Sequence, residues 1–223
     1  MSDKQRRQSH AANRLGSTVA SNGLGARLRL ARAGKDISVR ELARRVGVSP
    51  SLVSQIERGR VMPSVGTLYS MATALELLLD ELFKDAGPRR TTGDNGKSGR
   101  AAPSPVQRRN RRKSIKLAAG VRWERLTSTP DQQVEFLYVV YDVGAASCDP
   151  DSLIRHGGRE YAYMISGRLG VKIGFEEFAI GPGDSISFDA ERPHRLWTIG
   201  KEPAVAIWVV LNRGSYSRMR SPV

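Results

Sequence analysis

Apolar side chains recur with two different periods along this 223-residue chain. Between residues 24 and 83 they return every three or four positions, which is the spacing of one face of an amphipathic helix. From residue 115 onward that spacing gives way to short runs rich in Val, Ile, Tyr, Phe and Trp, separated by Gly, Pro and Asp. Such runs are typical of strands. The pattern therefore predicts an all-α unit followed by an all-β unit.

Helix start and stop signals divide the first unit. Ser38 is an N-cap with Glu41 three residues on, which predicts a capping box. Gly47 stands where a helix end needs a left-handed residue, and Ser49-Pro50 opens the next helix. We expect five helices: one carrying Leu24, Leu28, Leu30 and Ala31, two within Ser38–Gly59, one over Pro63–Leu75 and a short one over Leu77–Phe83.

The second helix of the pair within Ser38–Gly59 has a polar outer face. Leu52, Val53 and Ile56 form its inner face. Any helical hairpin shows apolar periodicity, but the coinciding caps, turn glycine and polar face favour a unit that places a helix in a DNA groove. The residues predicted to contact DNA are Ser38, Arg40, Ser49, Pro50, Ser51, Ser54, Gln55 and Arg58.

Residues 24–83 resemble the XRE family of phage-repressor-like helix-turn-helix domains. The resemblance rests on ELARRVGVS, SLVSQIERG, PSVGTL and LDELF. It implies a five-helix DNA-binding domain of a transcriptional regulator. Family members often carry Gln just after the cap of the first of the paired helices, where Val39 stands here. Arg40 and Arg44 are the candidates to replace its phosphate contact.

The second unit contains about eight short strands, which indicates a sandwich or barrel. Its turns fall at Ser166-Gly167, Gly174 and Gly181–Asp184. The expected strands are Val121–Thr127, Val134–Val143, Tyr161–Ser166, Leu169–Ile173, Phe175–Ile180, Ser185–Phe188, His194–Thr198 and Val205–Leu211.

The strings HGGREYAYMISG and PGDSISFDAERPH resemble the two motifs of the cupin family, over about residues 154–210. The resemblance implies a double-stranded β-helix (jelly-roll) barrel with a central pocket. It also implies metal ligands at His156, Glu160 and His194, whereas Ile154 occupies the position of the family's first histidine. Three ligands can still hold zinc, iron or manganese, but the lost ligand favours a metal-free pocket that binds a ligand by hydrogen bonds.

The expected effector pocket comprises His156, Arg159, Glu160 and His194. Arg155, Arg192 and Arg195 also stand beside the motif positions, and arginine suits carboxylates and phosphates. We therefore expect a small effector such as an amino acid or organic acid. The three tryptophans, Trp123, Trp197 and Trp208, are expected to pack in the core, and Cys148 to be an inert thiol.

Charge and composition set the expected boundaries. Residues 1–113 hold 23 Lys and Arg against 9 Asp and Glu, whereas the remainder holds 13 of each, so the basic half is the one with the helix-turn-helix. We expect a disordered basic tail over 1–23, the helix-turn-helix domain over 24–83, a flexible basic linker over 84–113, the cupin-like domain over 114–213 and a short tail over 214–223.

These expectations combine into one function. The chain is predicted to be a homodimeric regulator, in its expected form a repressor, whose affinity for a DNA operator is controlled by a small molecule in the barrel. Because the linker is loose, a change in dimer geometry is favoured over a rigid lever. The alternatives are a metal-dependent cupin enzyme fused to a DNA-binding domain, and a constitutive DNA-binding protein with an inert barrel. No signal peptide or membrane span is apparent, so a cytoplasmic, nucleoid-associated protein is expected.

Overall fold

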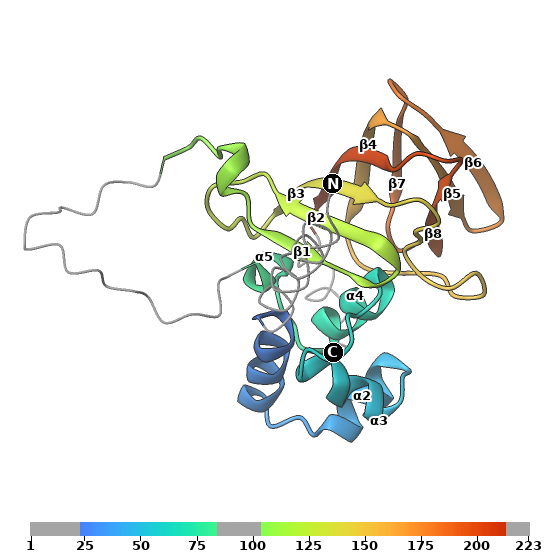
Figure 1. Cartoon of the computed structure of the whole chain (residues 1–223). Helices are drawn as coiled ribbons and strands as arrows, with labels where there is room; N and C mark the ends of the chain where they lie inside the picture. Colours follow the sequence, from blue (N-terminus) through green and yellow to red (C-terminus); the bar gives the residue numbers. More distant parts are fainter. Residues whose placement is uncertain (1–22, 84–103, 213–223) are drawn as a thin grey trace, which may run out of the picture.

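A computed structural model describes residues 23–83 and 104–212 (Figure 1). The basic tail expected over 1–23, apart from its last residue, and the tail over 214–223 lie outside the described residues. Residues 84–103 of the expected linker lie outside them as well. The predicted order of an all-α unit followed by an all-β unit is confirmed.

Five helices make up the first unit. Their inner faces meet in a core in which Leu28, Leu42, Val53, Leu68 and Met71 are fully buried. Leu30 differs from the expectation, because it lies on the outside of the first helix with 72% of its side chain exposed. The helices span residues 23–34, Val39–Val46 (α2), Pro50–Glu57 (α3), Val65–Ala74 (α4) and Leu79–Leu82 (α5).

The predicted caps form with one exception. Ser38 accepts a hydrogen bond from the Glu41 N–H, and Gly47 ends α2 with a φ of 75°. The reciprocal half of the capping box is absent, because the Glu41 carboxylate accepts from Arg44 and Arg45 instead. Hydrogen bonds from Arg44, and then Arg45, lower the pKa of Glu41 to about 2.

The first helix crosses the end of α3 at very close range. A Cβ on Gly25 would lie 2.2 Å from the Ile56 carbonyl oxygen, so only glycine fits at this crossing. About two turns further along the first helix, Nε and Nη2 of Arg32 donate hydrogen bonds to the two carboxylate oxygens of Glu57, at 2.6 Å and 2.9 Å. This bidentate pair holds the first helix against the helix that is predicted to enter DNA.

The second unit is a two-sheet antiparallel barrel, and the cupin architecture is confirmed. One sheet has the order β1-β2-β3-β9-β4-β7 and the other β6-β5-β8. All eight expected strands begin and end within two residues of the prediction, and the short β1 was missed. The strands span Ser114–Lys116 (β1), Val121–Arg125 (β2), Val134–Tyr141 (β3), Arg159–Ser166 (β4), Arg168–Ile173 (β5), Glu176–Ile180 (β6), Ser185–Asp189 (β7), His194–Ile199 (β8) and Ala204–Leu211 (β9).

The helical unit packs directly on the barrel through α4 and α5 (Figure 1). The Pro63 carbonyl accepts from the Ala118 N–H at 2.9 Å, and the Gly66 N–H donates to the Ser147 carbonyl at 3.2 Å. Beyond α4, Asp80 lies 3.5 Å from the Arg125 guanidinium, with both side chains buried. Buried side chains of both units form one continuous core, so the two units are docked in this structure.

Residues 104–113 return the chain to the barrel. They include a short 3₁₀ turn over Arg109–Arg111, and Lys113 accepts through its carbonyl from the Arg125 N–H. Arg112 lies 3.3 Å from Glu124 and over the Tyr138 ring. None of the helices among residues 23–83 and 104–212 has the length and apolar character needed to cross a membrane.

Candidate functional site

Helix α3 presents the side chains expected to contact DNA. Ser51 and Arg58 are exposed, Ser54 and Gln55 are half-buried, and Gln55 donates to the Ser51 hydroxyl at 3.2 Å. Val53 and Ile56 are buried on the opposite side of the helix. The structure therefore leaves a polar face on α3 and fixes the orientation of one amide on it.

The flanks of α3 carry the remaining predicted contacts. Ser49 caps α3 and Pro50 takes its first position, while Ser38 caps α2. Arg40 and Arg58 are exposed and make no ion pair with any residue that the structure describes. All eight predicted residues thus lie on α2, on α3 or at the caps of these helices.

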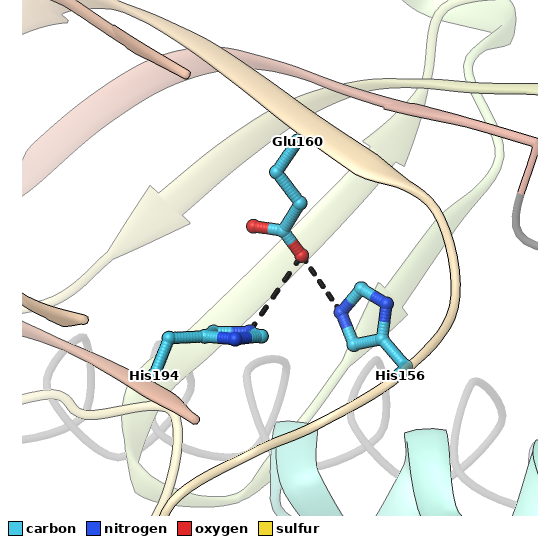
Figure 2. Close-up of side chains that lie close together, drawn as sticks. All are labelled: His156, Glu160 and His194. Atoms are coloured by element: carbon cyan, nitrogen blue, oxygen red, sulfur yellow. Dashed lines mark ion pairs between the residues drawn. The ribbon is translucent and has the colours of Figure 1, made fainter. Parts of the chain in front are cut away.

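A second cluster lies inside the barrel, where His156, Glu160 and His194 converge (Figure 2). Glu160 comes from β4 and His194 begins β8, so the cluster joins the two sheets. Glu160 Oε1 lies 2.7 Å from His156 Nε2 and 3.7 Å from His194 Nε2. Their side chains are nearly inaccessible to solvent.

Both imidazole rings are held by the nitrogen that points away from the carboxylate. Nδ1 of His156 lies 3.0 Å from the Gly157 carbonyl, and Nδ1 of His194 lies 2.9 Å from the Arg192 carbonyl. A carbonyl oxygen can only accept, so each Nδ1 carries the N–H. In a neutral ring each Nε2 then presents a lone pair to Glu160.

With both imidazoles neutral, the cluster would have no positive charge beside the Glu160 carboxylate. Nε2 of His156 is buried and makes no hydrogen bond with the described residues, although a carboxylate oxygen of Glu160 lies beside it. The ligand atoms of the three residues lie within 4.8 Å of one another. A divalent cation placed between them would accept a lone pair from each, and backbone-anchored imidazoles with a carboxylate are a common donor set for zinc, iron or manganese. The residues present thus fit a metal ion.

Ile154 occupies the place of a fourth donor. Its side chain is buried and lines the same cavity, and its backbone pairs with that of His194. Because a hydrocarbon cannot ligate, any metal here keeps at least one position open to water or a ligand.

The surroundings tune the charges of the cluster. Burial opposes ionisation of Glu160, but the adjacent imidazoles and the Trp208 N–H, 3.0 Å away, hold the pKa of its carboxyl below the ordinary value. Burial lowers the pKa of His194 and raises that of the Tyr141 phenol. A neutral His194 and an anionic Glu160 are the states in which both groups donate lone pairs.

The cavity beside the cluster is small. Its free volume is about 20 Å³, which holds on the order of one water molecule or an ion. Its wall includes aromatic residues of the barrel, Trp123, Tyr141 and Trp208, together with Val65 and Tyr69 of α4. The ring of Tyr69 stacks on that of His156, with centroids 4.1 Å apart and planes 19° apart.

The structure does not bring the expected arginines to this cavity. Arg159 is exposed on the other face of β4, over the Tyr161 ring, because side chains alternate along a strand. Arg192 binds Glu176, and Arg195 binds the Cys148 carbonyl. The predicted anionic effector therefore loses the support of a basic rim.

Sequence reasoning missed most of the cavity wall, including the two residues that contact the cluster, Trp208 and Tyr69. Trp208 was expected to serve packing alone, and the alternation of β9 that places it on the inner face with Val210 was the available signal. Tyr69 was overlooked because its partner, His156, is 87 positions away along the chain. No local pattern reports such a contact.

Comparison with known proteins agrees with this architecture. The sequence matches the "Helix-turn-helix domain" family over residues 23–83 and the "Cupin domain" family over residues 137–210. A solved helix-turn-helix transcriptional regulator of the HTH_3 family from Vibrio cholerae superposes with a TM-score of 0.60 at 19% identity. That match covers 87% of this chain and 98% of the other, and shows the fold alone.

Three curated relatives are regulators by name. An uncharacterized HTH-type transcriptional regulator, y4dL, of Sinorhizobium fredii is 48% identical over 50 residues, covering 22% of this chain and only 26% of its own length. HTH-type transcriptional regulator PuuR of Escherichia coli is 22% identical, over 76% of this chain and 84% of its own. An uncharacterized transcriptional regulator of Rhodospirillum rubrum is 37% identical, over 38% of this chain and 84% of its own. The chain belongs to the helix-turn-helix transcriptional regulators, with a cupin domain following its DNA-binding domain.

Proposed function

We propose that the protein is a homodimeric, cytoplasmic regulator, in its simplest form a repressor, whose operator affinity depends on what occupies the cupin cavity. The observation that carries the proposal is the union in one chain of an exposed polar recognition helix and a buried set of three lone-pair donors. A cation held between these three donors would change the charge of the cluster, and this change is the signal that the proposal requires.

The DNA-binding half of the proposal rests on α3. Gln55 can make two hydrogen bonds to an adenine edge, and Ser51 holds its amide in place. Arg58 and Arg40 are free of described acidic partners, so their charges are available to phosphates. Arg108, Arg109 and Arg111 of the linker end are also exposed and add a non-specific contribution.

The effector half rests on the donor set and on the open fourth position beside Ile154. His156, Glu160 and His194 would hold the metal, and the open position would take one donor atom of a small molecule. The second candidate, a metal-dependent enzyme, draws on the same three ligands. Turnover of a substrate by the metal-loaded chain separates it from the sensor, which binds without turnover.

The proposal that the protein is a dimer rests on an apolar face of the larger sheet. Phe136 of β3 and Tyr161, Tyr163 and Ile165 of β4 are 37–52% exposed, on the two strands that flank β9. The register places Phe136, Val209 and Tyr161 side by side across β3, β9 and β4. A second copy is the occupant that fits, because helix-turn-helix domains read two half-sites as symmetric pairs.

The experiment that tests the proposal is selection of binding sequences from random duplex DNA by the full-length chain, followed by titration of the selected duplex. We expect an inverted repeat whose half-sites lie about one helical turn, roughly 10 bp, apart. Affinity should differ between Zn(II)-loaded and EDTA-treated protein, and the difference should vanish in Glu160→Gln. No enriched sequence would overturn the DNA-binding proposal, whereas equal affinities with and without Zn(II) would overturn metal control.

A further inference from the structure

Helix α4 belongs to two structures at once. Leu68, Met71 and Ala72 are fully buried in the core of the helix-turn-helix domain. On its other side, Val65 and Tyr69 form part of the wall of the cupin cavity. The recognition helix and the cavity therefore share a rigid element.

The contact between α4 and the barrel is tight. Tyr69 is 4% exposed, and its ring lies 4.1 Å from that of His156 and 5.5 Å from that of Trp123. Its hydroxyl donates to Glu135 of β3 at 3.3 Å. Three residues earlier, Gly66 lies against the barrel so closely that an added Cβ would be 3.2 Å from Ile154 Cγ1 and 3.6 Å from Cys148 Cβ.

We infer that α4 is the lid of the cupin cavity and that Tyr69 is its plug, so that a docked helix-turn-helix domain and an organic ligand in the cavity exclude each other. The free volume of about 20 Å³ admits an ion or on the order of one water molecule, but no organic molecule of several atoms. A metal ion held by His156, Glu160 and His194 would leave the Tyr69 ring stacked on that of His156. An organic ligand has to displace Tyr69 from the cavity wall. Because Tyr69 is part of α4, and α4 is packed in the core of the helix-turn-helix domain, the whole domain moves away from the barrel with it.

The inference rests on the proposed effector function of the cavity and supplies its mechanism. Occupation by an organic molecule frees the helix-turn-helix domain from the barrel, which changes how the two DNA-binding heads of a dimer are spaced. A metal ion alone leaves the domain docked and acts on DNA binding only through the changed charge of the cluster. The two classes of ligand therefore have different effects on DNA binding.

A disulfide lock tests the lid. In Gly66→Cys the new thiol faces Cys148, which is the chain's single cysteine, at a Cβ separation suited to a disulfide. Burial raises the pKa of the Cys148 thiol, so diamide under mildly alkaline conditions is the oxidant of choice. We expect an intramolecular disulfide in the full-length variant. Ser70→Cys, on the exposed side of the same helix, is the matched control and should form none.

Access to the cavity is then measured by acrylamide quenching of tryptophan fluorescence, since Trp123 and Trp208 line it and Trp197 contributes equally to every variant. Quenching should fall on oxidation of Gly66→Cys and return on reduction, and oxidation of Ser70→Cys should leave it unchanged. Adding Tyr69→Ala to the oxidised lock should restore quenching, because the plug is gone.

Absence of the disulfide, or equal quenching of the locked and reduced forms, would overturn the inference. Neither readout uses DNA, metal or effector. A protein that binds no effector would therefore contradict the proposed function while leaving the lid intact.

Discussion

At the scale of single residues, the closest contact in the helix-turn-helix domain involves a residue that has no side chain. Gly25→Ala should destabilise the domain by about 1–3 kcal/mol, because its methyl group would have to push two backbone carbonyls aside. Gly34 ends the same helix with nothing within 4 Å of a Cβ, so Gly34→Ala should be neutral or stabilising by about 0.5–1 kcal/mol.

Denaturant unfolding of both variants, followed by the far-ultraviolet helical signal, checks this pair. A Gly25→Ala variant as stable as Gly34→Ala would show that the first helix crosses α3 at a greater distance. Both variants replace Gly by Ala in the same helix, so the difference between their free energies of unfolding reports the contact of residue 25 with α3.

Residues whose roles depend on the local chain were predictable, and those whose roles depend on remote partners were not. Ser38, Gly47 and Ser49 act on backbone groups within four positions, and their sequence context was sufficient. Glu41 failed as a capping-box residue because two arginines on the next turn compete for its carboxylate. The sequence around Glu41 does not predict whether its carboxylate binds the Ser38 N–H or these arginines.

At the scale of elements, α3 yields a prediction about specificity. If Gln55 reads a base, Gln55→Ala should cost about 1–3 kcal/mol on the selected operator and relax specificity at one position. Arg58→Ala, as a phosphate contact, should weaken binding to operator and random DNA alike and reduce the salt slope by about 1. Fluorescence anisotropy across a salt series measures both effects. Parallel losses on both DNAs for the two variants would contradict the separate roles.

Elements as such were well predicted, because hydrophobic period and turn residues are local. The strands bearing the motifs were placed within two residues, and β4 alternates as expected, with Glu160, Ala162 and Met164 inward. The same alternation shows why the prediction of Arg159 as a pocket residue was wrong, since Arg159 is adjacent to Glu160 and faces the other way. The missed β1 is three residues long and carries a single buried side chain, Ile115.

At the scale of the whole molecule, contacts between the units were the part that sequence could not supply. Composition predicts where one unit ends and the next begins, and these boundaries stay a prediction. It gave no sign that Asp80 and Arg125 pair across the junction or that Tyr69 reaches His156. A long polar linker limits neither arrangement, because it only has to span the distance between two docked surfaces.

The proposed dimer gives the last prediction at this scale. Tyr163 is 52% exposed near the middle of the apolar face, beside Ile207 of β9. In a dimer that buries this face, Tyr163→Glu places a carboxylate in an apolar interface, which costs several kcal/mol unless the charge is paired. The variant should therefore be monomeric by light scattering at concentrations where the wild type is dimeric.

Phe175→Glu is the matched control, because Phe175 is fully exposed at the turn between β5 and β6 in the smaller sheet. It should remain dimeric. Tyr163→Glu should also lose affinity for a duplex with two half-sites while keeping the wild-type affinity for a single half-site, since α3 itself is untouched. A dimeric Tyr163→Glu would move the interface to another surface, and a monomeric wild type with full operator affinity would remove the dimer from the mechanism.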